Sequence, residues 1–522
     1  MKKHYFLNGL LIASMATILL LMNACSTPAY KRTVPADAVS VVELDVKNIA
    51  QKADFMDQKD QIADLIASVE PGNRLYRKLA DAVKNPTNAG LNLAKPVYLF
   101  ALPSLEDAFL TAAVKDDEAL IQMLISLSDE FDVLQSGELT WITYNNKLFG
   151  VITKNVLLIS TTGTTKEKSV FRDLLTQKED DSFFSTREFH AMRLHHGDVT
   201  MLVNMRALSN NSKRDIRKEL ENEFGVDDME DIWNDIRETH VLANLICESG
   251  KISMNLFAGG MDDLSSKVLA KKLDTEALKK IPNRNLAGIM AFSIDGKACW
   301  EEIDKELNPS KRKMSRRERN RYEAIGEYVL QLNGTVVGSI GGNKLFKNPE
   351  VLCVLPAPKA ETKSTLVALG ERLPEDVYMD GNNTHTAITN MINYDYSSVP
   401  TPFDKASAAN ATYAYAYLKA EPFISDLFDD LTRHAKRGEL KVYNQLRDLC
   451  ELADYAELKV EDGDMLQLFI ARAHESMDVK GEGKNKVSLT LYLNDASDNA
   501  LSLILKKGIA LGNTVVEYEN EK

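Results

Sequence analysis

The stretch PADAVSVVELDVKNIAQKA, residues 35–53, sets the pattern from which the fold is predicted. Its side chains alternate between two faces from Val39 to Leu44, which is typical of a β-strand. Asp45 ends this strand, and a helical pattern follows. An Asp at such a junction caps a helix by accepting hydrogen bonds from its first N–H groups. The sequence therefore predicts a turn led by Pro35, then a strand, then a helix.

The second half of the chain repeats this order of elements. PNRNLAGIMAFSIDGKACWEEI, residues 282–303, again has a Pro-led turn, an alternating strand, an Asp (Asp295) and a helical pattern. Downstream, both halves predict three further groups of elements in the same order. The first is strand, loop, strand and helix, the second is a strand followed by a helix, and the third is a pair of strands. The corresponding segments are 95–127 and 335–371, 197–216 and 411–431, and 240–260 and the pair 456–473 with 486–495.

We therefore predict an α+β fold of two tandem, loosely duplicated modules, residues 35–275 and 280–515. Short connections with Asn, such as Tyr144–Lys147 and Lys154-Asn155 in ITYNNKLFGVITKNVLLIS (142–160), predict hairpins. Antiparallel sheets with helices packed on one face fit this pattern better than a doubly wound parallel fold.

The N-terminal residues predict export from the cytoplasm. Lys2 and Lys3 precede an apolar run that ends in LLLMNACSTP, residues 19–28. This run is marginal for a membrane-spanning helix, which needs about 20 strongly apolar residues. A basic start, an apolar segment and a small residue before the cut are typical of a signal peptide, here cleaved after Ala24.

Ala24 and Cys25 resemble the lipobox of bacterial lipoproteins, although Met22 and Asn23 depart from its usual residues. The resemblance implies that residues 1–24 are a signal peptide and that acyl chains on Cys25 anchor the protein in a membrane. Ser26 in place of Asp implies the outer membrane, on either its periplasmic or its outer face. Ser26–Val34 is predicted to be a polar tether of at most about 30 Å. The alternatives are an ordinary signal peptide with an incidental Cys, or an uncleaved anchor.

Composition narrows the classes of function. The chain has 522 residues, of which 44% are hydrophobic, and a net charge of −13. This length exceeds what one core supports, and the acidic balance argues against a nucleic-acid partner. Cys247, Cys299, Cys353 and Cys450 lack zinc-ligand spacing. We favour buried free thiols for these four, while disulfide pairing stays open because the envelope permits it.

No motif makes a coherent catalytic or metal site. VGSIGG (337–342) resembles a nucleophile elbow around Ser339, but Val337 replaces its first Gly and no helix follows. His195-His196 fits a polar helix end better than a metal site. The acidic run 226–238 fits a capped amphipathic helix better than a calcium loop. We predict no metal and no cofactor.

Two surfaces are candidates for binding. The first is a basic run, which is either a solvated helix start or a patch for an anionic partner such as a lipid headgroup. The second is a row of tyrosines on one strand face in ATYAYAYLK (411–419), which is either core or an aromatic face for a glycan. The basic residues are Lys311, Arg312, Lys313, Arg316, Arg317, Arg319 and Arg321, and the tyrosines are Tyr413, Tyr415 and Tyr417.

The lipobox, the PADA-strand-Asp-helix opening and the strand KPVYLFAL (95–102) together resemble an uncharacterised family of Gram-negative gut-bacterial envelope lipoproteins with a domain of unknown function. The resemblance implies a location and a fold but no catalytic residues.

We therefore expect a lipid-anchored envelope protein that binds or scaffolds a protein or glycan partner without catalysis. The alternative is an envelope hydrolase or glycan-processing enzyme whose residues converge only in the fold. A third reading, an assembly or chaperone-like factor, requires a broad exposed apolar groove.

Overall fold

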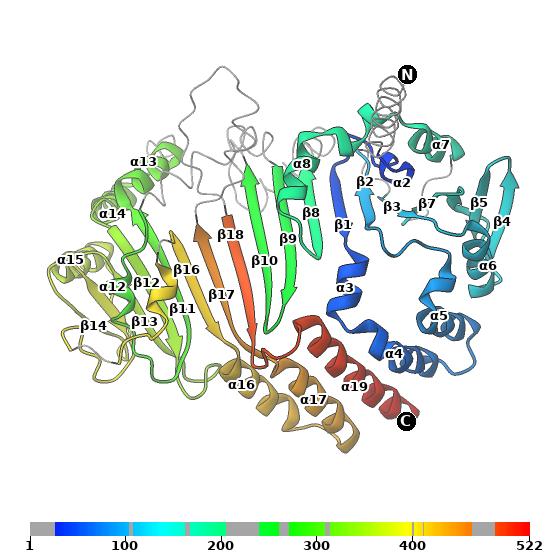
Figure 1. Cartoon of the computed structure of the whole chain (residues 1–522). Coiled ribbons are helices and arrows are strands. Elements are labelled where there is room, and N and C mark those ends of the chain that lie inside the picture. The colour runs from blue at the N-terminus through cyan, green and yellow to red at the C-terminus, as the bar shows by residue number, and fades with distance from the viewer. Residues whose placement is uncertain are drawn as a thin grey trace, which may run out of the picture. The chain divides into compact units, whose positions relative to one another are not determined.

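The computed structural model describes residues 27–103, 108–161, 167–204, 240–259, 271–307, 314–398, 401–410, 412–461 and 486–521 (Figure 1). The chain divides into two compact units. Unit 1 combines the residues up to Lys47 with Asn85–Leu194, and unit 2 combines Asn48–Lys84 with the chain from His195 onward. Cys25 and the acidic run 226–238 lie outside the described residues. The predicted module boundaries stay predictions.

Unit 1 is built on an antiparallel sheet. Asn145 and Asn146 have φ angles of 50° and 59°, and Tyr144 pairs with Lys147, so the predicted hairpin turn is confirmed. The sheet order is β1 (Ser40–Leu44), β2 (Val97–Ala101), β3 (Ala108–Ala113), β7 (Val156–Ser160), β6 (Lys147–Ile152), β5 (Leu139–Tyr144) and β4 (Phe131–Ser136).

Helices cover both faces of the unit 1 sheet, which differs from the predicted single face. Leu120 of α6 (Asp117–Leu127) packs with Ile142 and Leu157 on one face. On the other, Phe171 of α7 (Lys168–Thr176) meets Phe109 and Trp141 edge to face. Both faces of β3 and β7 carry large apolar side chains, so each face needs a cover. Unit 1 also contains α2 (Ala29–Arg32), η1 (Pro86–Ala89), η2 (Glu179–Asp181), η3 (Phe183–Ser185) and α8 (Arg187–Leu194).

The sheet of unit 2 is also antiparallel, and the last strands of the two sequence halves pair within it. Met254 of β10 lies opposite Leu489 of β18. The sheet order is β8 (Val199–Asn204), β9 (His240–Glu248), β10 (Lys251–Gly259), β18 (Lys486–Leu493), β17 (Ala453–Glu461), β16 (Ala414–Lys419), β11 (Leu286–Asp295), β12 (Asn333–Gly341), β13 (Glu350–Leu355), β15 (Thr386–Thr389) and β14 (Tyr378–Gly381).

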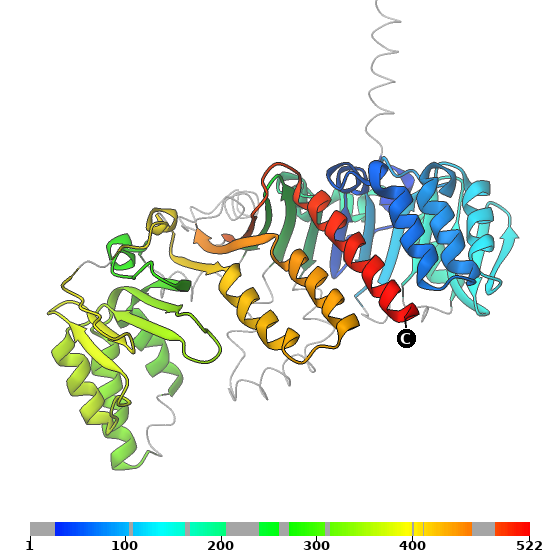
Figure 2. The same cartoon turned by 90° about the horizontal axis from the view of Figure 1, so that it is seen from below.

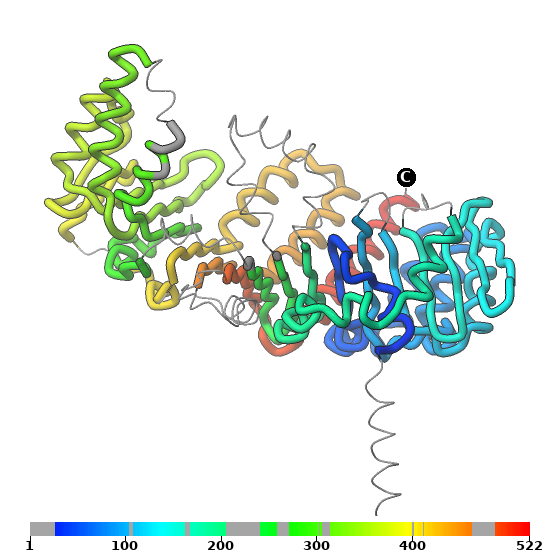
Figure 3. The backbone as a smooth tube through the Cα atoms, turned by 90° about the horizontal axis from the view of Figure 1, so that it is seen from above, coloured from blue at the N-terminus to red at the C-terminus, as the bar shows by residue number. Residues whose placement is uncertain are grey.

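Helices α16 (Ala420–Thr432), α17 (Arg437–Cys450) and α19 (Ala500–Asn520) lie side by side on one side of this sheet (Figures 2 and 3). Leu503 of α19 packs with Ile252 and Leu491 of the sheet. The short α12 (Thr275–Leu278) and η5 (Ala406–Ala409) instead pack on the face that carries Ile289 and Tyr415. The other helices of unit 2 are α4 (Phe55–Val69), α5 (Arg74–Lys84), α13 (Gly296–Leu307), α14 (Arg316–Val329) and α15 (Lys359–Leu369), while α3 (Val46–Lys52) crosses the boundary between the units.

The α+β class predicted from the sequence is confirmed, and the order of elements recurs. Strands β2 and β3 lead to α6 in the first half, and β12 and β13 lead to α15 in the second. Asp295 caps α13 as predicted, because its Oδ1 accepts hydrogen bonds from the N–H groups of Lys297 and Ala298, both at 3.1 Å. Among the described residues, no helix combines the length and apolarity that crossing a bilayer requires.

A candidate ligand pocket in unit 2

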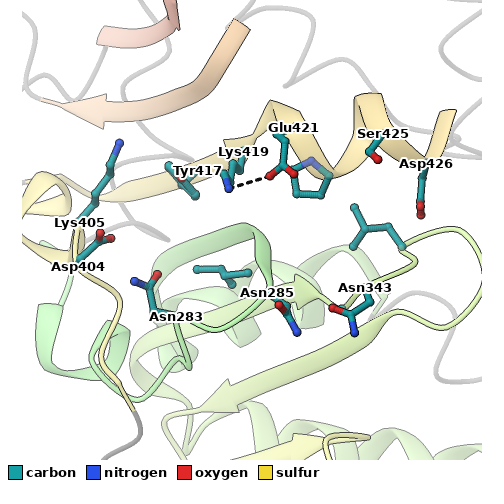
Figure 4. A pocket seen from close by; sticks show the side chains of 14 residues that line it. Asn283, Asn285, Asn343, Asp404, Lys405, Tyr417, Lys419, Glu421, Ser425 and Asp426 are labelled. Atoms are coloured by element: carbon teal, nitrogen blue, oxygen red, sulfur yellow. Dashed lines mark hydrogen bonds and ion pairs between the residues drawn. The ribbon is translucent and has the colours of Figure 1, made fainter. Parts of the chain in front are cut away.

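A pocket of about 430 Å³ opens where β16 passes into α16 (Figure 4). Its size falls within the range of small-molecule sites, roughly 300–1,000 Å³. Polar side chains from four separate stretches of unit 2 supply most of its lining. They are Asn283, Asn285, Leu286, Gly342, Asn343, Leu345, Asp404, Lys405, Tyr417, Lys419, Glu421, Pro422, Ser425 and Asp426.

One wall comes from the junction of β16 and α16. Tyr417 and Lys419 are two residues apart on the strand, so they share one face. The Lys419 Nζ lies 2.9 Å from the Glu421 Oε2. Pro422 sits in the first turn of α16, where a missing N–H costs no helical hydrogen bond. One turn further, Ser425 and Asp426 extend the wall (Figure 4).

Three asparagines from two loops form the facing wall. Asn285 directly precedes β11, and Asn343 lies two residues past the end of β12. These strands are antiparallel, so the start of one and the end of the other meet at one edge of the sheet. The Asn285 carbonyl accepts a hydrogen bond from the Gly342 N–H at 2.9 Å, which ties the loops together.

Asn285 has a φ angle of 53°, in the left-handed region. Asn tolerates this conformation better than most residues with a side chain. A polar side chain is thus kept at a position where glycine is the usual choice, and it lines the pocket.

Asp404 and Lys405 close one end, beside a row of aromatic rings. The Lys405 Nζ lies 5.3 Å from the ring centroid of Tyr417 and 3.0 Å from that of Tyr455. Tyr417 and Tyr455 have centroids 5.4 Å apart, and Tyr455 stacks on Tyr492 at 4.4 Å. Tyr455 is thus in contact with Lys405, Tyr417 and Tyr492, and Tyr417 is the ring of this row that also lines the pocket.

Burial and nearby carboxylates shift the pKa values of these groups. Burial, with Asp454 and Asp404 nearby, raises the pKa of Tyr417 to about 12. Burial also lowers the pKa of Lys405, although Asp454, Glu457 and Asp404 oppose this change. At neutral pH the Tyr417 side chain is thus a neutral phenol that can both donate and accept a hydrogen bond.

The lining suits a ligand rich in hydroxyl groups. Each Asn amide offers donors and an acceptor, carboxylates accept, and lysine ammoniums donate. A polyol can both give and take hydrogen bonds at each of its hydroxyls, while an aromatic ring such as Tyr417 packs against its C–H groups. The pocket thus combines the amide and carboxylate groups that form hydrogen bonds with the aromatic ring of Tyr417.

Comparison with known proteins places the chain in a family. Residues 30–336 match the family model described as Domain of unknown function (DUF4836). The chain belongs to this family. No curated protein matches the chain. Among solved structures, crystal form IV of TP0453 is 9% identical at a TM-score of 0.25, over 47% of this chain and 86% of that one. Crystal form III of TP0453 is 8% identical at a TM-score of 0.26, over 50% and 89%.

Membership of this family confirms the predicted resemblance to an uncharacterised family, and no biochemical role comes with it. The predicted envelope location and lipid anchor stay predictions.

The predicted row of tyrosines begins at Tyr413, directly before β16, and continues with Tyr415 and Tyr417 on one face of this strand, but it is mostly buried. Tyr413 is 6% exposed and Tyr415 is 1% exposed. Tyr415 donates its hydroxyl to the Glu457 Oε1 at 2.8 Å. Tyr413 and Tyr415 therefore belong to the core, and Tyr417 reaches the pocket.

The described part of the predicted basic patch is the start of α14. Ser315 and Glu318 form a capping box, with hydrogen bonds of 3.3 Å and 2.7 Å. Arg316, Arg317 and Arg319 are exposed and Arg321 is half-buried. Lys311, Arg312 and Lys313 lie outside the described residues. The patch is therefore at least partly a solvated helix start, and its partner stays a prediction.

The weaker catalytic motifs have structural explanations. Ser339 is 8% exposed inside β12, which pairs with a strand on each side, so no nucleophile elbow is present there. His195 follows the end of α8, as a polar helix end predicts. Within the described residues, no group of three or more His, Cys, Asp or Glu side chains is placed to hold a metal ion.

The four described cysteines are free thiols. Cys247 is buried, and the other three are half-buried. Burial raises the pKa of all four thiols, and the Asp198 carboxylate raises that of Cys247 further. A raised thiol pKa disfavours the thiolate, so these residues are not activated nucleophiles.

The sequence did not point to most of the pocket. Asn283, Asn285 and Asn343 lie in loops whose meeting depends on the pairing of β11 with β12. One signal was available, because Asn-Arg-Asn before a strand is a turn pattern that favours Asn in the left-handed region.

Proposed function

We propose that this protein is lipid-anchored in the bacterial envelope and binds a saccharide in the unit 2 pocket without transforming it. The observation that carries the binding proposal is the lining: three Asn side chains face Lys419, Glu421 and the ring of Tyr417 across one opening (Figure 4). The Lys2-Lys3 start, the apolar run and Ala24-Cys25 support the anchor.

The carboxylates of the pocket favour binding over catalysis. Glu421 is ion-paired with Lys419, and its side chain is 71% exposed. Asp426 accepts a hydrogen bond from the Phe346 N–H at 3.3 Å. A glycosidase uses a pair of carboxyl groups, and its general acid sits in a buried, apolar site. Glu421 lacks such surroundings.

The test compares two Asn→Gly variants with matched backbones. Asn285→Gly removes a pocket side chain, and glycine keeps the left-handed backbone. Asn393→Gly is the control, because Asn393 is exposed, has a φ angle of 63° and lies outside the pocket lining. Calorimetry and saturation-transfer NMR would measure binding of glucose, mannose and N-acetylglucosamine hexaoses.

We expect at least one hexaose to bind, with Asn285→Gly at least tenfold weaker and Asn393→Gly unchanged. A tenfold change corresponds to about 1.4 kcal/mol, within reach of lost hydrogen bonds. Binding of no hexaose, or equal losses in both variants, would overturn the saccharide proposal.

A glycan hydrolase is the second candidate, since Asp404, Glu421 and Asp426 line one pocket. Paired carboxylates are the usual machinery of that reaction. If the protein is a hydrolase, wild type should shorten the hexaoses during incubation, and the Asp404→Asn and Glu421→Gln variants should leave them intact. Intact hexaoses after incubation with wild type would support the binding protein.

A further inference from the structure

The chain is fixed to unit 1 from Thr27, two residues after Cys25. The Thr27 N–H and hydroxyl both donate to the Glu179 Oε1, at 2.9 Å and 2.6 Å. These hydrogen bonds lower the pKa of the Glu179 carboxyl. This attachment differs from the polar tether predicted for Ser26–Val34.

The residues that follow are packed into the unit. Tyr30 of α2 is 3% exposed and Val34 is fully buried. The Thr33 hydroxyl donates to the Tyr30 carbonyl at 2.7 Å, and the Gln177 amide donates to the carbonyls of Arg32 and Val34 at 3.0 Å and 3.1 Å. The polarity and Pro28 of this segment suggest a tether, but Tyr30 of α2 and Val34, which lies just past the end of this helix, are both buried in the unit.

Lys31 adds a cation held among aromatic rings. Its Nζ lies 5.4 Å from the ring centroid of Tyr98, 4.9 Å from that of Phe184 and 5.7 Å from that of Phe189. Such contacts are worth more when the cation is partly desolvated. Burial lowers the pKa of this ammonium, while the Glu43 carboxylate opposes that change.

We infer that residues 27–34 are a rigid mount that holds unit 1 directly against the phospholipid headgroups. Two residues span at most about 7 Å, whereas the predicted tether would reach about 30 Å. The acyl chains on Cys25 would therefore leave unit 1 little freedom to rise or turn. The bilayer partner of this surface rests on the lipid anchor of the proposed function.

The test measures how close unit 1 lies to the lipid. The full chain, labelled at Asp180→Cys, would be reconstituted in phosphatidylcholine vesicles that contain a headgroup-labelled acceptor lipid. Asp180 is exposed and adjacent to Glu179. Wild type labelled in parallel corrects for the native thiols. Energy transfer then reports the distance from unit 1 to the membrane surface.

Three variants separate a mount from a tether. The first carries ten Gly and Ser residues inserted between Ser26 and Thr27, which leaves the fold untouched. The second, Tyr30→Ala with Lys31→Ala, releases the mount. The third, Tyr30→Phe, is its matched control, because the Tyr30 hydroxyl has no hydrogen-bond partner among the described residues.

We expect high energy transfer for the parent labelled chain and for Tyr30→Phe. The insertion should lower transfer by at least twofold, and the double variant should lower it too. Equal transfer with and without the insertion would overturn the mount. If the double variant fails to fold, the insertion alone decides.

The anchor is tested separately. Flotation of the parent chain with vesicles, and loss of flotation in Cys25→Ser, depend on the acyl chains and not on the mount. Flotation of both chains would overturn the lipid anchor, whereas flotation of the parent chain alone, with equal energy transfer in the insertion variant, would overturn the mount and leave the anchor standing.

Discussion

Lys52 and Asp198 form a buried ion pair at 2.8 Å that connects α3 to the sheet of unit 2. The Asp198 side chain is 2% exposed and that of Lys52 is 24% exposed. Asp198 also accepts hydrogen bonds from the Asn48 side chain at 2.5 Å and the Cys247 N–H at 2.6 Å. A buried carboxylate is stable only with such partners, so this aspartate fixes the position of the helix.

Lys52→Met is therefore expected to destabilise unit 2. Removing one partner of a buried pair leaves an uncompensated charge and costs about 3 kcal/mol. In urea unfolding followed by circular dichroism, the transition of unit 2 should occur at a lower urea concentration than in wild type. The double variant Lys52→Met with Asp198→Asn should recover part of the loss, since no charge is then left buried. A double variant as unstable as the sum of the single ones would contradict this account.

Local patterns predicted the parts of the fold that depend on neighbours in sequence. Asp295 caps a helix because its side chain reaches N–H groups two and three residues ahead. Asn145 and Asn146 form a turn because Asn tolerates positive φ. Such features need no knowledge of distant contacts, and both follow from the sequence.

Features that depend on pairing between distant strands could not be predicted in the same way. Asn285 and Asn343 meet because β11 pairs with β12. The mount around Tyr30 depends on Glu179, which lies about 150 positions along the chain from Thr27. The lone apolar residues of this segment therefore resembled those of a linker.

Asp380 should make unit 2 sensitive to acid. The Tyr396 N–H, which donates to its carboxyl at 2.6 Å, is the main cause of the lowered pKa of Asp380, and Lys359 adds to it. A lowered folded-state pKa gives stability that is complete above the unfolded value, about 3.9, and is lost as the pH falls through the folded value.

The melting temperature of Asp380→Asn should therefore lie below that of wild type at pH 6, and the gap should narrow toward pH 3. Calorimetric scans across this range would measure both. Asp376→Asn changes an exposed aspartate four residues upstream and is the matched control. If the difference in melting temperature between wild type and Asp380→Asn stayed the same at every pH, the charge of this carboxylate would not be the source of the stability.

The arginines at the start of α14 should contribute more to the binding of anionic surfaces than to the stability of the fold. Cations at a helix N-terminus oppose the helix dipole, so Gln at positions 316, 317 and 319 should raise stability by a few tenths of a kcal/mol. If this patch meets anionic lipid, the same triple variant should bind vesicles with phosphatidylglycerol more weakly.

The Cys25→Ser background would be used for this binding assay, so that the anchor does not mask it. Lys344, Lys347 and Lys363 are exposed cations of the same unit, and their triple Gln variant is the matched control. Equal loss of vesicle binding in both triple variants would mean that net charge, and not this patch, drives the contact.

Cys25 carries the predicted anchor, and its replacement by Ser should release the protein from membranes. Wild type should enter the detergent phase and incorporate labelled palmitate, because several acyl chains give firm binding. Cys25→Ser should do neither. Mass spectrometry would distinguish a cleaved N-terminus from a retained signal peptide. Wild type without acyl mass would mean that Ala24-Cys25 is not a working lipobox.

Tyr415 should contribute to stability but not to ligand binding, although it is two residues from Tyr417. Its hydroxyl donates at 2.8 Å to Glu457, which is 4% exposed and lies 3.3 Å from the Lys459 Nζ. Tyr415→Phe removes a donor from a buried carboxylate, which costs about 2 kcal/mol. Tyr415 does not line the pocket, so the hexaose affinity should stay the same.

The comparison variant is Tyr417→Leu, which removes the ring that lines the pocket. It should weaken hexaose binding by at least fivefold, a change of about 1 kcal/mol. Unfolding curves and calorimetric titrations on the same samples would separate the two roles. Loss of affinity in Tyr415→Phe at a temperature where it is fully folded would instead mean that the buried Tyr415–Glu457 bond shapes the pocket. Helix α16 would then be the element to examine, since it starts one residue after β16 ends.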